Sequence, residues 1–251
     1  MTKISKNDRI MVIGSCFAAN IGSRLAADGF DVCLNPFGTV FNPASIFNCV
    51  QRMKSQEPFT HEECVEMGAG AGKICSFSHH TSFARERAED FLENANRSLS
   101  EASRKWREAD VVIVTYGTAQ VWKHSGLIVS NCLKRPGYEF THEMLSLEEV
   151  RGYTAGIIED GKRYIFTVSP VRHMGEGANV NTISKATLQL ALHSSLKENC
   201  SYFPAYEIML DELRDYRWYA EDLVHPTQEA ADYIYRKFLL ATDAADAVDR
   251  G

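Results

Sequence analysis

Two stretches at opposite ends of the chain carry residue types that could perform covalent chemistry. Ser15 and Cys16 stand side by side in MVIGSCFAANIG, and Asp222 and His225 are three residues apart in DLVHPT. A carboxylate that holds one imidazole nitrogen leaves the other nitrogen free to act on a nucleophile. These four residues are therefore a candidate catalytic set, although an isolated D-x-x-H is more often a surface histidine beside a helix-capping aspartate.

The position of the two candidate nucleophiles favours a reactive residue there. A short apolar run ends immediately before them, and a helical pattern begins immediately after them. The N–H groups and the dipole of a helix N-terminus favour negative charge, lower the pKa of a thiol and can stabilise an oxyanion. A buried structural cysteine with Ser15 as helix cap fits these residues equally well. The stretch alone does not choose between Ser15 and Cys16.

Further candidates lie in SPVRH and in NTISKATL. Arg172, next to His173, offers a planar set of donors that suits an acyl or phosphate-bearing group. The alternative is an arginine that ties its loop to a nearby carboxylate. Ser184 and Lys185 open a predicted helix, where capping explains the serine and Lys185 could reach the site.

Other motifs are better explained without special chemistry. His61 with Cys64, and Cys75 with His79, have no second ligand pair at a structural-zinc spacing, so we expect no metal site. GAGAGK, residues 68–73, lacks the Walker spacing and a preceding strand, and it is predicted to be a loop. A redox-sensing role for Cys16 is a weaker interpretation, because no second cysteine is near it in sequence.

The elements that must position these residues can be predicted from five short apolar runs. The runs are rich in Val, Ile, Phe or Tyr and do not alternate with polar residues, which is typical of buried parallel strands. They cover residues 9–14, 30–34, 110–117, 163–170 and 206–210. Helical patterns separate them, over residues 17–29, 42–54, 82–108, 146–160, 181–198 and 226–241. This alternation predicts a parallel sheet with helices on both faces and with ligands at the carboxyl ends of the strands.

Length and composition set the domain count and exclude several classes of partner. With 251 residues, 45% of them hydrophobic, the chain is expected to form one domain over 1–251. The second and third strands are too far apart for one crossover, so residues 50–108 are expected to hold an insertion or lid-like segment. A net charge of −6 without a basic stripe makes nucleic acid an unexpected partner.

The same survey gives expectations about localisation. No apolar run is long enough for a signal-peptide core or a membrane span. Seven cysteines form an odd set without a disulfide framework, so we expect a reduced, cytoplasmic protein. The acidic end, residues 241–251, is expected to be a frayed helix tail. Nothing in the sequence fixes the oligomeric state.

The chain resembles the GSCFA family, a branch of the SGNH/GDSL hydrolase superfamily. IGSCFA carries the signature, and NPFGTVFNP, TYGTAQVW, SPVRH, NTISKATL and DYRWYAEDLVHP resemble further family blocks in the expected order. The resemblance implies a three-layer α/β/α sandwich of the flavodoxin-like SGNH type, with a five-stranded parallel sheet. It also implies an esterase, deacylase or acyltransferase, since the superfamily acts on carbohydrates and lipids.

The resemblance also assigns roles to residues. Aligned with the superfamily's Gly-Asp-Ser block, Gly14 replaces Gly, Ser15 replaces Asp, and Cys16 replaces the nucleophile. Cys16 is then the nucleophile, with His225 as base, Asp222 as its orienting partner and Ser15 as the alternative nucleophile. The oxyanion donors implied are the N–H groups of Cys16, Gly38 and Gly117. The third block departs from the pattern, because Gly117-Thr118-Ala119-Gln120 lacks the usual Asn and Gln120 is its candidate replacement.

The expected function is acyl transfer through a covalent acyl-enzyme on Cys16. Hydrolysis and transfer both remain open, on a small-molecule, carbohydrate or thioester substrate. No cofactor is expected to be required, although a thioester of the coenzyme A type could serve as co-substrate. His80, Gln120, Arg172, His173 and Lys185 are the expected substrate-binding residues. The alternative is a non-catalytic module that binds a glycan or acyl ligand in the same cleft.

Overall fold

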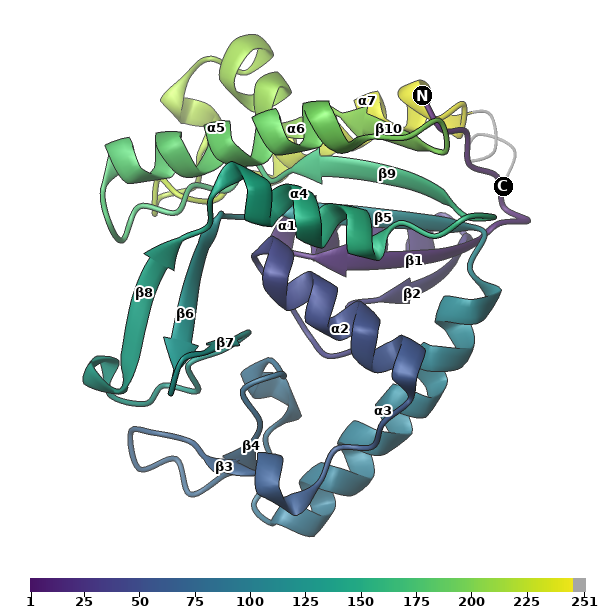
Figure 1. Cartoon of the computed structure of the whole chain (residues 1–251). Coiled ribbons are helices and arrows are strands. Elements are labelled where there is room, and N and C mark those ends of the chain that lie inside the picture. Colours follow the sequence, from purple (N-terminus) through teal and green to yellow (C-terminus); the bar gives the residue numbers. More distant parts are fainter. Residues whose placement is uncertain (246–251) are drawn as a thin grey trace.

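A five-stranded parallel sheet forms the centre of the protein in a computed structural model, which describes residues 1–245 (Figure 1). The strand order is β10 (Cys200–Phe203), β9 (Arg163–Val168), β5 (Val111–Tyr116), β1 (Arg9–Gly14) and β2 (Asp31–Leu34). The order reverses between β1 and β5, which makes the carboxyl ends of these two strands the topological switch point where open α/β sheets bind ligands. The predicted tail beyond residue 245 lies outside the described residues.

Helices cover both faces of this sheet, because successive residues of each buried strand point to opposite sides. Met11 and Ile13 belong to one core, with buried residues of α2 (Pro43–Ser55), α3 (Ala88–Glu108), α4 (Leu147–Ile157) and α5 (Ala178–Ser195). Ile10 and Val12 belong to a second core, with α1 (Cys16–Ala27) and α7 (Gln228–Ala241). The expected parallel sheet of five strands between helices is therefore confirmed.

The predicted fifth strand, residues 206–210, is wrong. The strand is β10, and the chain after Pro204 forms a helical turn, α6 (Ala205–Glu207), followed by the wider π-helical turn Ile208–Glu212. Ala205, Ile208 and Met209 are the buried residues there. Their spacing of three and four is helical, and Pro204 fits a helix start better than the middle of a strand. A short apolar run was thus misread as a strand.

The helix boundaries follow local capping chemistry. The Asn42 side chain accepts the Ser45 N–H at 2.8 Å, so α2 begins where the Asn-Pro pair predicts. Ser146 and Glu149 form a reciprocal capping box at the start of α4. The predicted helix at 82–108 begins later, at Ala88, because Thr81–Phe83 is a separate 3-10 turn.

A second, antiparallel sheet after β5 was not predicted. It consists of β6 (Gln120–His124), β7 (Leu127–Val129) and β8 (Phe140–Met144) and stands beside the carboxyl edge of the main sheet (Figure 1). Ser125 and Gly126 both have positive φ and join β6 to β7 as a two-residue hairpin turn.

The segment between α2 and α3 has little regular structure. Its strands β3 (Val65–Glu66) and β4 (Ile74–Cys75) form one short antiparallel pair, and 3-10 turns lie at His61–Glu63 and Thr81–Phe83. Within it, the N–H of His80 donates to the Phe37 carbonyl at 3.0 Å. This contact brings one end of the segment against the loop after β2.

Candidate active site

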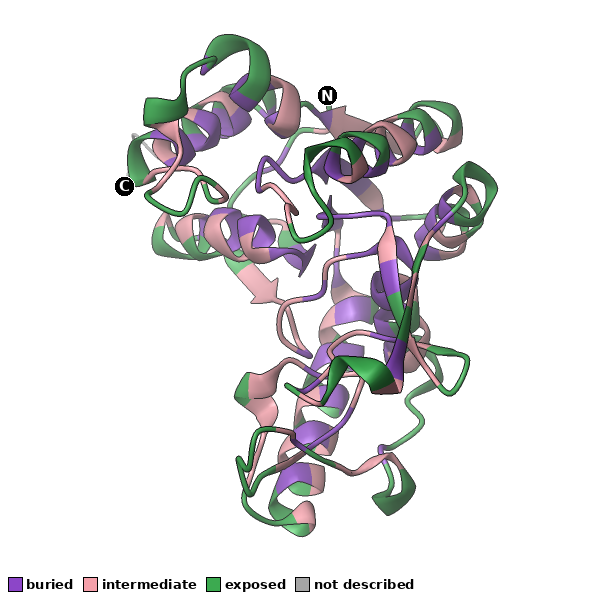
Figure 2. Cartoon of the chain, turned by 90° about the vertical axis from the view of Figure 1, so that its left-hand side faces the viewer, coloured by how far each residue is buried: buried purple, intermediate pink, exposed green. Residues whose placement is uncertain are grey.

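Ser15 and Cys16 lie at the junction of β1 and α1, on the carboxyl edge of the main sheet. This edge faces the viewer in Figure 2. Gly14 precedes them with φ of +148°, and a Cβ there would lie 2.2 Å from the Thr115 carbonyl oxygen. Only glycine therefore lets β1 turn so closely over β5. Ser15 is fully buried and its hydroxyl has no hydrogen-bond partner among residues 1–245, whereas Cys16, the first residue of α1, is partly exposed.

Opposing influences act on the Cys16 thiol. The pKa of this thiol lies above its ordinary value, because burial raises it more than hydrogen bonding from the N–H groups of Phe17 and Cys16 and the positive charge of Lys185 lower it. The N–H groups of the first turn have no helical acceptors, so they are available to a thiolate or an oxyanion. The site therefore contains an accessible thiol with anion-stabilising groups around it.

Lys185 supplies a buried positive charge beneath this junction. Its Nζ donates to the carbonyl oxygens of Gly117, Ser169 and Val171 at 2.6, 2.8 and 2.9 Å, and the residue is 1% exposed. Burial lowers the pKa of Lys185 to about 7, and the charge of Cys16 acts against that shift. Three carbonyl acceptors need three N–H donors, which only the ammonium form provides. All three N–H donors of the ammonium are thus bonded to backbone carbonyls.

The Asp222–His225 pair is present as the sequence predicts. Nδ1 of His225 lies 2.7 Å from Oδ2 of Asp222, and Oδ1 of Asp222 accepts the N–H groups of Val224 and His225 at 2.9 and 3.0 Å. These hydrogen bonds, that with the His225 side chain first, lower the pKa of Asp222 to about 2. The carboxylate therefore stays ionised and fixes the imidazole so that its other nitrogen faces away from Asp222.

The loop that carries His225 is closed on itself and tied to the end of β9. The N–H of Ala220 donates to the His225 carbonyl at 2.8 Å. Arg172 donates from its guanidinium to the Leu223 carbonyl at 2.9 Å and from its backbone N–H to the Val224 carbonyl at 3.1 Å. Arg172 thus holds the loop, as the alternative interpretation of SPVRH predicted, although through carbonyl groups and not through a carboxylate.

The candidate nucleophile and base are not hydrogen bonded to each other. Within the described residues, neither the Cys16 thiol nor the Ser15 hydroxyl is bonded to His225. Burial lowers the pKa of His173 to about 4, with smaller contributions from the charges of Lys185 and His225, which lie near it. His173 is consequently a neutral imidazole near pH 7.

The N–H groups predicted as oxyanion donors have different environments. Those of Gly38 and Gly117 donate to the carbonyls of Asn35 and Phe41, both at 2.7 Å. The His80 side chain packs against Gly38, and its Nδ1 is 3.0 Å from the Ser82 hydroxyl. The N–H of Cys16 is therefore the predicted donor that remains directed to the thiol.

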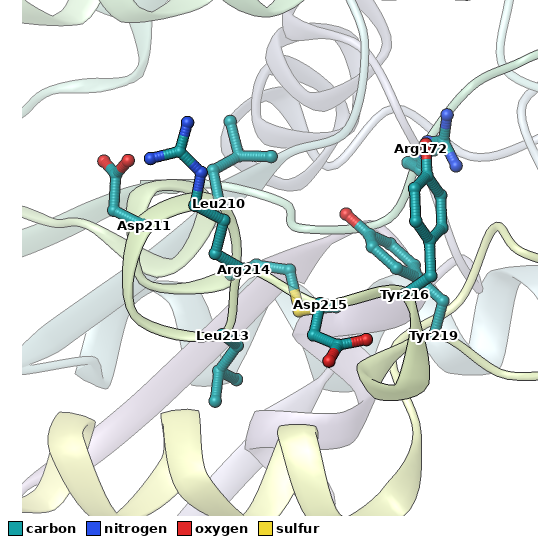
Figure 3. A pocket seen from close by; sticks show the side chains of 9 residues that line it. Arg172, Leu210, Asp211, Leu213, Arg214, Asp215, Tyr216 and Tyr219 are labelled. Carbon is teal, nitrogen blue, oxygen red and sulfur yellow. The ribbon is translucent and has the colours of Figure 1, made fainter.

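Two cavities flank the loop after β9, and consecutive residues line them. Arg172 lines a cavity of about 400 Å³ with Met209, Leu213, Tyr216 and Tyr219, where it lies beside the two tyrosine rings (Figure 3). His173 lines the other cavity, of about 300 Å³, which we call the amide pocket. The amide pocket is enclosed by ten residues: Phe41, Asn42, Thr118, Gln120, Trp122, Val129, Ser130, Asn131, Cys132 and His173.

Sequence reasoning missed Asn35, Asn181 and Trp122 among the residues that shape the site, and it gave Ser184 a different role. The Asn35 side chain accepts the Gly14 N–H at 2.8 Å, and the Asn181 side chain accepts the His173 N–H at 2.9 Å. The Ser184 hydroxyl accepts the Ala119 N–H at 2.7 Å, so this serine holds the third-block turn and does not cap its own helix. Asn35 directly follows a strand, which was the available signal; Trp122 had none, because β6 was not predicted.

Comparison with known families decides the affiliation of the chain. The model of the GSCFA family matches residues 9–238, from the first residue of β1 into α7. The chain belongs to the GSCFA family. No curated protein and no solved structure matches it. The matched range of this GSCFA chain includes the Cys16 junction, both cavities and the Asp222–His225 loop.

In residues 1–245, no helix is long and apolar enough to cross a membrane. In the same residues, no three His, Cys, Asp or Glu side chains converge as a metal site would require.

Proposed function

We propose that the protein is an acyl-transfer enzyme that uses Cys16 as nucleophile, His225 as general base and Asp222 as the residue that orients His225. The observation that carries the proposal is the contrast between neighbours: the Cys16 thiol is accessible at a helix N-terminus, and the Ser15 hydroxyl is fully buried. A nucleophile must meet the acyl carbon, so the partly exposed Cys16 is a better candidate than the fully buried Ser15.

The proposed reaction has two steps. In the first, His225 accepts the thiol proton, the Cys16 sulfur bonds to the acyl carbon, and the bond from that carbon to the leaving oxygen or sulfur breaks. The leaving group takes the proton from His225. In the second step, a water or hydroxyl loses its proton to His225 and attacks the thioester, the carbon–sulfur bond breaks, and the thiol is restored. The ionised Asp222 stabilises the imidazolium that forms in each step.

The charge that develops on the acyl oxygen requires donors. The N–H of Cys16 and that of Phe17 lie at the helix N-terminus beside the sulfur, and the Lys185 ammonium adds a positive charge below. A preorganised donor of this kind is worth roughly a factor of 10²–10³ in rate. Gly38 and Gly117 would contribute only after exchanging their present carbonyl partners, so the helix N-terminus is the main candidate.

An SGNH-type arrangement with an insertion near residues 50–108 belongs to the same proposal. It is supported by the strand order, since counting only the parallel strands along the chain gives 2-1-3-4-5, the flavodoxin-like order. Thiol nucleophiles exchange readily with thioesters, which favours a coenzyme A-type donor and transfer to a carbohydrate or other hydroxyl over simple hydrolysis.

The proposal can be tested by trapping the acyl-enzyme. The protein is incubated with p-nitrophenyl acetate or acetyl-coenzyme A, digested at low pH and examined by mass spectrometry. One acetyl group is expected on the peptide that contains Cys16, and Cys16→Ala should abolish it. Cys132→Ala is the matched control, because Cys132 is a second half-buried thiol in the amide pocket. An acetyl group that persists in Cys16→Ala, or that moves to Ser15, would refute the assignment.

A second candidate function is a non-catalytic module that binds a glycan or acyl ligand. The observation that favours it is the lack of a hydrogen bond between His225 and either Cys16 or Ser15 in the described residues. The same labelling experiment separates the two functions. No acetylation of Cys16 by any activated ester or thioester, together with ligand binding, would favour the binding module.

A further inference from the structure

The walls of the amide pocket carry no charged side chain. None of the ten lining residues is Lys, Arg, Asp or Glu, and the pKa of His173 near 4 leaves its ring neutral at pH 7. A phosphate, carboxylate or ammonium group would lose its hydration there without gaining a counter-charge. The cavity on the other side of the loop differs in this respect, because Arg172, Asp211, Arg214 and Asp215 line it. The amide pocket is therefore suited to an uncharged ligand.

Amide groups in the pocket offer hydrogen bonds that the protein does not use. Oδ1 of Asn42 accepts the Ser45 N–H, and Oδ1 of Asn131 accepts the Leu133 N–H, both at 2.8 Å. The NH₂ group of each asparagine has no partner in the described residues. The Gln120 side chain has no partner there either. Together they present donors and an acceptor, the combination that hydroxyl groups match because each hydroxyl is both.

An aromatic surface completes the pocket. The Trp122 side chain is 40% exposed although it lines a cavity, and His142 stacks on it at 4.3 Å with an interplanar angle of 23°. This stacking restrains the indole at the pocket wall. Phe41 and His173 add a second pair of rings, in edge contact at 5.9 Å. Rigid rings beside unpaired amides are typical of sites that bind a ring with an apolar face and hydroxyl edges.

The amide pocket adjoins the reactive junction. A Cβ built on Gly117 would lie 3.0 Å from His173 Nε2 and 3.3 Å from the Cβ of Ser15, the residue before Cys16. His173 is therefore shared between the pocket wall and the turn that presents the thiol. Thr118 and His173, which line the pocket, follow β5 and β9 at the carboxyl edge of the sheet where Cys16 also lies.

We infer that the amide pocket binds a neutral sugar ring, and that a hydroxyl of this sugar is the acyl acceptor of the Cys16 thioester. The second half of the inference rests on the proposed function. In that step the sugar hydroxyl loses its proton to His225, its oxygen bonds to the acyl carbon, the carbon–sulfur bond breaks, and the proton ends on the Cys16 sulfur. Recognition of the sugar does not require the reaction and is tested without it.

Sugar binding is measured on the full chain by saturation-transfer NMR and by tryptophan fluorescence. The probes are the methyl glycosides of glucose, galactose, mannose, xylose and N-acetylglucosamine, with glucuronic acid and glucose 6-phosphate as charged counterparts. At least one neutral glycoside should bind saturably, and the charged compounds should bind at least about tenfold more weakly. Binding should be unchanged in Cys16→Ala, which separates this inference from the proposed function.

Two variants locate the binding. Trp122→Ala should abolish it, and the matched control Tyr138→Ala should not, because Tyr138 is 88% exposed in the connection between β7 and β8 and lies outside the pocket. Asn131→Asp keeps the acceptor for the Leu133 N–H and removes the free NH₂, so it should fold normally and weaken binding about five- to tenfold. No binding of any neutral glycoside, equal binding of the charged compounds, or wild-type binding by Trp122→Ala would each overturn the inference.

Discussion

Two histidines, His79 fully buried and His173 partly buried, predict a steep loss of stability in mild acid. His79 is fully buried among the rings of Phe37, Phe59, Phe83 and Phe91, with the Ser76 hydroxyl at 2.7 Å as its polar partner. Burial, with a smaller contribution from the charge of Arg52, lowers the pKa of His79 to about 3. His173 behaves similarly, with burial as the main cause of a pKa of about 4.

The direction and the size of this change in stability with pH follow from the two pKa values. Both histidines have a lower pKa in the folded protein than the ordinary value of 6.5, so the unfolded chain binds more protons in acid. Their neutral rings therefore contribute fully to the free energy of unfolding only above about pH 6.5. This contribution is lost progressively as the pH falls from about 6.5 towards 4 for His173 and 3 for His79. Between about pH 7 and pH 4.5, each histidine should lower the free energy of unfolding by about 2–3 kcal/mol, and the two together by about 5 kcal/mol. That sum is comparable with the whole stability of a marginal domain.

The assay is urea unfolding followed by circular dichroism at a series of pH values. His79→Gln cannot titrate, so its free energy of unfolding should fall by about 2–3 kcal/mol less over this range than that of the wild type. The comparison uses the slope with pH, so a constant cost of the substitution does not matter. His193→Gln, at an exposed position of α5, is the matched control and should leave the slope unchanged. Equal slopes for the wild type and His79→Gln would refute the reasoning.

Three further predictions concern the candidate site. Lys185→Met should raise the pH midpoint of Cys16 alkylation, because it removes a positive charge that lowers the pKa of the thiol, whereas Lys162→Met, at the opposite end of the strands, should not move it. Arg172→Met should speed hydrogen exchange in residues 220–225 by about tenfold, because the loop loses its bond to Leu223. Gly38→Ala should cost at least about 2 kcal/mol of unfolding free energy, because φ is +81° and the new Cβ would lie 2.3 Å from that of His80.

Each of these has an outcome that contradicts it. An unchanged alkylation midpoint in folded Lys185→Met would show that the ammonium does not influence the thiol. Wild-type exchange rates in the 220–225 loop would show that its own hydrogen bonds are sufficient without Arg172. A fully stable Gly38→Ala protein would mean that the loop after β2 and the segment at His80 can move apart.

The strand ends could be predicted from the sequence because buried parallel strands are chemically uniform. The run at 9–14 and the glycine after it place Cys16 at a carboxyl edge, and the D-x-x-H spacing predicts the 2.7 Å contact between Asp222 and His225. Both inferences depend on residues close together in the chain. The prediction of a strand at 206–210 was wrong because a short continuous apolar run does not distinguish a buried strand from a buried helical segment.

Long-range hydrogen bonds could not be predicted in the same way. The three carbonyls that surround Lys185 come from two different strand ends, so nothing near residue 185 shows that its charge is buried. The Gly117 N–H is bonded to Phe41, more than seventy residues earlier in the chain. The antiparallel sheet at 120–144 had one local signal, the Ser125–Gly126 turn, between strands too short to stand out.

That antiparallel sheet carries part of the amide-pocket wall and none of the residues that we propose as catalytic. Gln120 and Trp122 lie on β6 and Asn131 follows β7, while Cys16 and His225 lie on other parts of the chain. The sheet rejoins the body at its base, where the Leu145 N–H donates to the Ala119 carbonyl at 2.9 Å, and Leu127 and Tyr138 at its far end are exposed. Strands of this kind can be lengthened or exchanged between homologues without disturbing the thiol. The sheet is therefore the place to redesign ligand preference, and the place where relatives with different substrates should diverge.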